Sequence, residues 1–124
     1  MRAFILIPLI LLCAGSAAGQ PVAAPVQGIA LYSYGYNPDP IVLTAGKAVT
    51  FNFVNRATKG HDFTAKKFFQ SSRIISGNVG EGEVDLAPGQ SASVTLVPAA
   101  GRYKVHCGHP FHKMLGMSGD IVVR

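Results

Sequence analysis

A short stretch near the C-terminus concentrates side chains that can bind a soft metal ion. Residues 107–117 hold one thiol, two imidazoles and two thioethers, from Cys107, His109, His112, Met114 and Met117. One thiol, one imidazole and one thioether on a single loop need a second imidazole from elsewhere to complete a ligand set. Two imidazoles and a thiolate, with a weak axial thioether, are typical of a blue-copper electron-transfer centre.

His61 is the candidate for the remaining imidazole, because it follows a clearly patterned strand. Residues 48–54 alternate, with Val49, Phe51 and Phe53 on one face, and this period of two indicates a half-buried strand. The chain leaves that strand through a polar segment and then reaches His61. We therefore expect His61 to project from a loop at one end of a β-sandwich.

Cys107 stands at the end of a second predicted strand. Tyr103, Val105 and Cys107 share one face, and the intervening residues are polar or basic. Since side chains of a strand alternate between its two faces, this pattern directs Cys107 into the core and His106 toward solvent. The strand therefore delivers a thiol to the inside of the fold.

The predicted ligands of one copper ion are His61, Cys107, His112 and Met117. The spacing is Cys-x4-His-x4-Met, and both intervals have loop length, so three of these ligands can converge without a helix. His109 and Met114 are alternative ligands on the same loop. His109 lies two residues after Cys107, which is close for a second ligand in the same plane, and we expect it to be an exposed loop imidazole.

Short alternating segments with turn signals between them recur through the rest of the chain. They cover residues 30–36, 41–43, 48–54, 83–86, 91–97 and 102–107. Residues 64–75 have loose helical spacing, which predicts one short helix. The pattern predicts an all-β fold, an antiparallel Greek-key β-sandwich or barrel with at most one short helix.

The N-terminus has the features of an export signal. Arg2 precedes an apolar run over residues 4–12, and small residues follow over 14–19. This is a charged region, a hydrophobic region and a cleavage-site pattern, and the run is too short for a spanning helix. We predict a signal peptide over 1–19, an N-terminal arm over 20–28 and a copper-binding domain over 29–124. The mature protein is then periplasmic or otherwise exported, with membrane contact through the signal peptide alone.

Export changes what the cysteines can do. Cys13 is lost with the signal peptide, so the mature chain keeps Cys107 as its single cysteine. An intramolecular disulfide is then excluded, and a metal ligand or a nucleophile becomes the favoured role in an oxidising compartment.

The charge of the mature chain is mildly positive. Loss of Arg2 leaves ten Lys and Arg against six Asp and Glu, and Trp is absent. The basic residues are scattered, which argues against nucleic-acid binding and fits a monomer whose surface favours an acidic protein partner.

These segments together resemble the cupredoxins, the small blue copper proteins, over almost the whole mature chain. The resemblance is carried by residues 45–63, which contain Ala-Gly-Lys, Thr-Phe, Asn55 and His-Asp-Phe, and by residues 101–119 with Gly-x-Tyr-x3-Cys. The Cys-x4-His-x4-Met loop is similar to that of rusticyanin and longer than the Cys-x2-His-x4-Met loop of plastocyanin.

The resemblance implies both a role and a docking face. His61, Cys107, His112 and Met117 would be copper ligands that suit Cu(I) and Cu(II), so that electron transfer needs little rearrangement. Apolar loop residues such as Phe111 and Leu115 would surround the second His, where a partner docks. Many family members carry Asn after the first His, whereas this chain has Asp62.

We therefore predict an electron shuttle, not an enzyme, whose partners are redox proteins such as cytochromes or a copper oxidase or reductase. A copper carrier or storage protein with the same ligands is the main alternative. A cysteine hydrolase would need an oxyanion hole and an orienting Asn or Asp beside Cys107 and a His, which the loop does not suggest. Structural zinc prefers more thiolates and has little use for Met.

Overall fold

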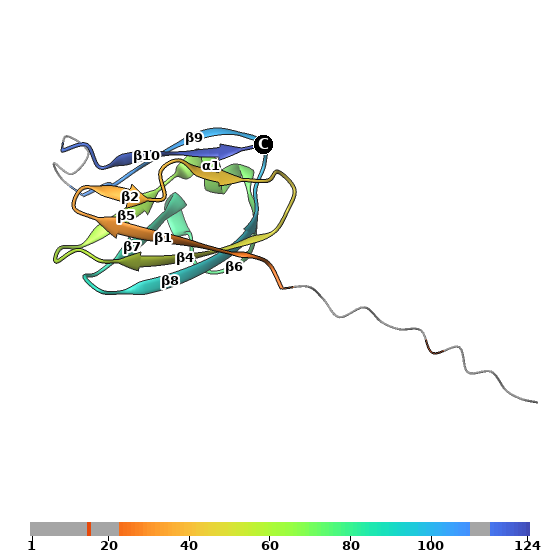
Figure 1. Ribbon diagram of the computed structural model, residues 1–124, viewed down its shortest axis with the longest axis horizontal. Coiled ribbons are helices and arrows are strands. Elements are labelled where there is room, and N and C mark those ends of the chain that lie inside the picture. The colour runs from red at the N-terminus through yellow and green to blue at the C-terminus, as the bar shows by residue number, and fades with distance from the viewer. Residues whose placement is uncertain (1–14, 16–22, 110–114) are drawn as a thin grey trace, which may run out of the picture.

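The computed structural model describes residue 15, residues 23–109 and residues 115–124. Within these ranges the chain folds into two five-stranded sheets packed face to face (Figure 1). The first sheet has the order β2-β1-β4-β8-β6 and contains β1 (Val26–Tyr32), β2 (Gly35–Asn37), β4 (Val49–Asn55), β6 (Arg73–Ser76) and β8 (Ser91–Val97). The second has the order β3-β10-β9-β5-β7 and contains β3 (Ile41–Leu43), β5 (His61–Thr64), β7 (Glu83–Leu86), β9 (Gly101–His106) and β10 (Ser118–Val123).

The predicted all-β sandwich with one short helix is confirmed. The helix, α1 (Lys66–Ser71), lies within the segment predicted to hold it, and a short 3-10 turn, η1 (Gly80–Gly82), precedes β7. Most strand pairs are antiparallel, but β1 pairs with β4, and β3 with β10, in parallel. The chain visits the second sheet through β3 between β2 and β4, so β4 returns to the first sheet running in the direction of β1.

The core between the sheets is built on phenylalanine rings. Phe51 and Phe53 from β4 meet Phe63 from β5, with the Phe53 and Phe63 ring centroids 5.0 Å apart. Phe68 of α1 stacks on Phe51 at 5.8 Å, and all four rings are fully buried. Burial of each such side chain contributes about 1.5–3 kcal/mol. This aromatic cluster fixes β5, and therefore His61 at its start, against the first sheet.

The N-terminal part of the domain differs from the predicted single strand over residues 30–36. The chain forms a hairpin there, because a turn at residues 33–34 separates β1 from β2. The two-residue turn shifts the buried positions from odd to even residue numbers, from Leu31 to Tyr36. The tyrosines at 32, 34 and 36 nevertheless keep their alternate spacing in the sequence, so the sequence pattern conceals the reversal. Strand β1 also begins at Val26, inside the predicted arm, where it gains a full ladder with β4.

The three tyrosines at alternate positions of this segment, Tyr32, Tyr34 and Tyr36, do not share one environment. Tyr32 and Tyr34 are exposed, whereas Ile29 and Leu31 on the opposite parity are buried in the core. Tyr36 on β2 is buried. The predicted signal peptide lies almost wholly outside the described residues. Among those that are described, no helix is long and apolar enough to cross a membrane.

Candidate metal centre

Two strands of the second sheet bring His61 and Cys107 together. His61 begins β5, and Cys107 follows the last residue of β9, which pairs with β5 through Thr64 and His106. The His61 Nδ1 atom lies 3.9 Å from the Cys107 Sγ atom. Both side chains are buried, at 0% and 1% exposure. Strand parity thus predicted the inward direction of Cys107 correctly.

Met117 reaches the same region from the other end of the loop. It lies directly before β10, which pairs with β9 from Ser118 opposite His106. The Cys107 N–H donates to the Met117 carbonyl oxygen at 3.2 Å, and the Met117 side chain is completely buried. Three of the predicted ligands therefore lie near one another, while His112 and the alternative Met114 fall outside the described residues.

The environment of Cys107 favours the protonated thiol. Burial raises the pKa of the Cys107 thiol, and the charges of Asp62 and Asp85 act in the same direction. The backbone N–H groups of Asp62 and His109 oppose that rise by donating toward the sulfur. Because a metal binds the thiolate, metal uptake at this site must release a proton and strengthen as pH rises.

Ser33 holds the His61 ring from the side opposite the thiol. Its Oγ atom lies 2.9 Å from His61 Nε2, and the Tyr34 ring meets the imidazole edge-on at 6.1 Å between centroids. If Nδ1 held a metal, the ring proton would stay on Nε2 and would be donated to the Ser33 Oγ atom. Such outer partners fix the orientation of a ligating imidazole. Sequence reasoning missed Ser33, since it lies in a turn 28 residues away from His61.

Asp62 ties strand β5 to the chain that follows Cys107. Its buried carboxylate accepts the Gly108 N–H at 2.8 Å and the Thr64 hydroxyl at 2.7 Å through Oδ1. Its carbonyl oxygen accepts the Tyr36 hydroxyl at 2.6 Å. Burial is the main cause that raises the pKa of Tyr36, so this hydroxyl remains a donor. The site therefore has a rigid polar frame on the side of β2 and β5.

Comparison with known proteins assigns this architecture to a protein family. The family described as Cupredoxin-like domain matches residues 3–123. The chain belongs to the cupredoxin-like family. A search of curated proteins finds no match.

Solved structures share the cupredoxin-like fold. Auracyanin from Roseiflexus castenholzii aligns with a TM-score of 0.61 and 21% identity, over 83% of this chain and 99% of that one. Auracyanin A from Chloroflexus aurantiacus, a "blue" copper protein, aligns with a TM-score of 0.58 and 21% identity, over 82% of this chain and 100% of that one. A multicopper oxidase from Campylobacter jejuni aligns with a TM-score of 0.63 and 13% identity, over 85% of this chain. The chain spans 31% of that oxidase.

The donor atoms of the cupredoxin-like site fit a copper ion. A soft sulfur and a borderline imidazole nitrogen, both shielded from water, suit copper in both of its common oxidation states. Metal bonds of about 2.0 Å to nitrogen and 2.3 Å to sulfur, at a trigonal angle, place the two donors roughly 3.7 Å apart. The separation between His61 Nδ1 and Cys107 Sγ is 3.9 Å.

His109 differs from the expected exposed loop imidazole. Its Nε2 atom lies 3.2 Å from Asp85 Oδ1 and 3.6 Å from Asp62 Oδ2, and one third of its side chain is exposed. The ring also lies against the backbone, since a Cβ on Gly60 would be 3.3 Å from its Cε1 atom. Asp62, Cys107 and His109 offer ligand atoms within 4.8 Å of one another. The structure thus keeps His109 next to the site, paired with acidic groups.

Asn55 shapes the loop that leads from β4 to His61. Its buried side chain donates to the Lys59 and Leu86 carbonyl oxygens at 2.8 and 3.0 Å and accepts the Ala57 N–H at 2.9 Å. These bonds satisfy the polar atoms of the Asn55 amide, which burial removes from water. The loop therefore presents His61 in a fixed position.

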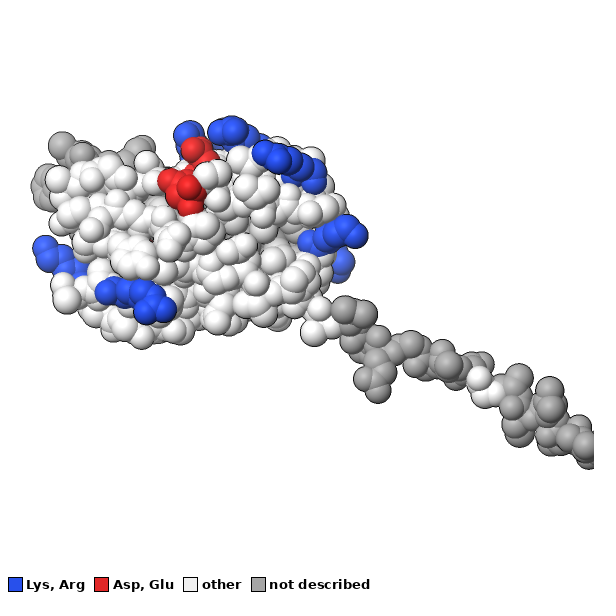
Figure 2. Space-filling view, viewed as in Figure 1, with Lys and Arg blue, Asp and Glu red and all other residues white. Residues whose placement is uncertain are grey.

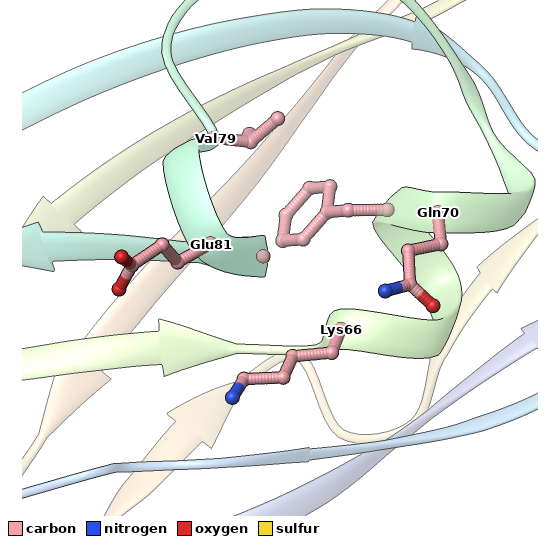
Figure 3. A pocket seen from close by; sticks show the side chains of 6 residues that line it. Lys66, Gln70, Val79 and Glu81 are labelled. Atoms are coloured by element: carbon pink, nitrogen blue, oxygen red, sulfur yellow. The ribbon is translucent and has the colours of Figure 1, made fainter.

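A separate hollow of about 490 Å³ lies between α1 and η1 (Figure 3). It is lined by Lys66, Phe69, Gln70, Val79, Glu81 and Gly82. Its two charged side chains have opposite signs and come from different segments. This lining does not identify a ligand class.

Proposed function

We propose that this cupredoxin-like protein is an exported type 1 blue copper protein that shuttles single electrons between redox proteins. The observation that carries the proposal is the buried approach of His61 Nδ1 to Cys107 Sγ, with Met117 beside them. These three residues and His112 would hold one copper ion. Copper in such a site supplies a reversible one-electron change between Cu(I) and Cu(II).

The protein's contribution to that chemistry is a fixed and dry environment. Ser33 orients the His61 ring, and Asp62 anchors the chain after Cys107. Because the frame is held by strands β5, β9 and β10, the donors need little movement when the charge of the site changes. Small rearrangement is the property that a carrier of single electrons requires.

The comparisons support this role by fold. Both auracyanins match this chain over nearly their whole length, and one of them is described as a "blue" copper protein. We therefore favour a carrier over an oxidase. Cytochromes or a copper oxidase or reductase are the proposed partners, and a monomer in the periplasm is the proposed form.

Electron exchange separates this role from copper transport, which the same ligands would permit. Copper-loaded protein should be reduced by hydroquinone and reoxidised by ferricyanide through many cycles, with no metal lost to a competing Cu(I) chelator. A protein that releases its copper on the first reduction, or transfers it readily to an apo-chaperone, would be a carrier. That result would reject the electron-shuttle proposal.

A further inference from the structure

A basic groove lies along β9, next to the start of α1. It has a volume of about 360 Å³ and is lined by Thr64, Lys66, Lys67, Arg102, Tyr103, Lys104 and His106. We call it the β9 groove. Strand parity explains part of this lining, because Arg102, Lys104 and His106 alternate with buried Val105 and therefore point outward. Tyr103 has the parity of Val105 and is half-buried.

Positive charge gathers around the β9 groove. Lys66, Lys67, Arg102 and Lys104 are all exposed. Asp120 pairs with Lys104 at 2.7 Å and offsets one of these charges. Figure 2 shows Lys and Arg side chains along the edge of the molecule where β9 runs in Figure 1. The groove therefore presents a local excess of positive charge to an approaching partner.

The floor of the groove is preorganised. The Tyr103 hydroxyl donates to the Ala99 carbonyl oxygen at 3.0 Å and accepts from the Ser71 hydroxyl at 3.1 Å. Its ring packs edge-on against Phe68 of the core at 5.3 Å between centroids. Because these contacts already hold the Tyr103 side chain in place, less conformational entropy is lost when a partner binds.

The groove is also the outer end of a short covalent route to the site. His106 lines the groove, and the next residue along the backbone is Cys107. Thr64 lies opposite His106 on β5, two residues after Asp62. The Asp62 N–H donates to the Cys107 sulfur, with 3.5 Å between nitrogen and sulfur. One peptide unit thus separates a surface residue from the candidate ligand.

We infer that the β9 groove is the docking site of an acidic redox protein that exchanges one electron with the site. This inference rests on the proposed function. In the exchange the partner's haem iron passes from Fe(II) to Fe(III) and the copper from Cu(II) to Cu(I), with no bond broken and no proton moved. Complementary charge steers such encounters and raises their association rate. The proximity to Cys107 favours a redox protein over a nucleic acid or a membrane.

The test compares two double variants with the same change in net charge. Lys67→Glu with Arg102→Glu reverses two charges in the groove. Lys47→Glu with Arg56→Glu reverses two exposed charges that do not line it, on the turn after β3 and directly after β4 of the other sheet. Reduction of the copper-loaded proteins by reduced cytochrome b5, an acidic haem protein, is followed by stopped flow at low and high salt.

The groove variant should react with cytochrome b5 about tenfold more slowly than wild type at low salt, and high salt should remove most of the difference. The control variant should stay within about threefold of wild type. Metal-free protein gives an independent readout. Oxidised cytochrome b5 should shift the amide NMR signals of β9 and of the start of α1, and the groove variant should lose these shifts.

Three results would overturn the inference. The two double variants could react alike, the NMR shifts could fall on another face, or DNA or phosphatidylserine vesicles could bind the groove more tightly than cytochrome b5. Hydroquinone, a small neutral reductant, distinguishes this failure from failure of the proposed function. If one of these three results is found while hydroquinone reduces all three proteins equally, the site works and the groove alone is refuted. If it cannot reduce wild type, the electron-shuttle role fails as well.

Discussion

Replacement of Asp62 by Ala should loosen the chain after Cys107 and destabilise the domain. The Asp62 carboxylate accepts the Gly108 N–H at 2.8 Å and the Thr64 hydroxyl at 2.7 Å, and its side chain is buried. Each lost hydrogen bond costs about 1 kcal/mol, and a partly buried amide left without an acceptor costs a further 1–3 kcal/mol. Asp62→Ala should therefore lower the free energy of unfolding by about 3 kcal/mol.

Urea unfolding of the metal-free protein measures this loss, and two further variants separate its causes. Asp62→Asn keeps an acceptor oxygen for both donors, as in the many cupredoxins with Asn here, and should cost less than about 1 kcal/mol. Asp39→Ala removes a carboxylate that accepts the Asp120 N–H at 3.0 Å in an exposed position, so it should cost little. Hydrogen exchange of the Gly108 amide should accelerate in Asp62→Ala and stay slow in the other two.

The reasoning would be refuted if Asp62→Ala were as stable as Asp62→Asn. It would also fail if Asp39→Ala lost as much stability as Asp62→Ala, because the effect would then come from any lost carboxylate. Unchanged protection of the Gly108 amide in Asp62→Ala would show that this bond does not hold the loop.

Three further outcomes follow from the same contacts. Tyr36→Phe removes the hydroxyl that donates to a buried carbonyl oxygen at 2.6 Å, and should cost about 1–3 kcal/mol in urea unfolding; no loss would contradict that bond. Ser33→Ala should weaken metal binding about tenfold in a competition assay without lowering metal-free stability by more than about 1 kcal/mol, because it removes a contact that orients the His61 ring; equal affinity would remove Ser33 from the site. Lys104 holds the pKa of Asp120 below its usual value, so their pairing adds stability above about pH 4 that is lost on further acidification. Wild type and Asp120→Asn should thus differ at pH 6 and converge near pH 2; a difference that persisted at pH 2 would contradict the pairing.

Much of the fold was predictable because its signals are local. Alternation over residues 48–54 and 102–107 gave β4 and β9. The parity of β9 gave the direction of Cys107, which its burial bears out. The hairpin at residues 33–34 was not predictable in this way, since the tyrosines keep their alternate spacing through the turn although the buried positions shift from Leu31 to Tyr36.

The outer parts of the site depend on contacts between residues far apart in the sequence. Ser33 meets His61 through the packing of a turn on the first sheet against the second. His109 contacts Asp85 because β7 pairs with β5 and places Asp85 opposite Asp62. The spacing of residues in the loop does not reveal this contact. The charge of the β9 groove likewise appears after α1 and β9 come together.

The most direct test of the central claim is the absorption and EPR spectrum of the Cu(II)-loaded protein. We expect an intense thiolate-to-copper band that disappears in Cys107→Ser and is strongly altered in His61→Gln and His112→Gln. His109→Gln, the matched change on the same loop, should keep the band. A colourless protein, or a band that survives Cys107→Ser, would contradict a blue-copper site.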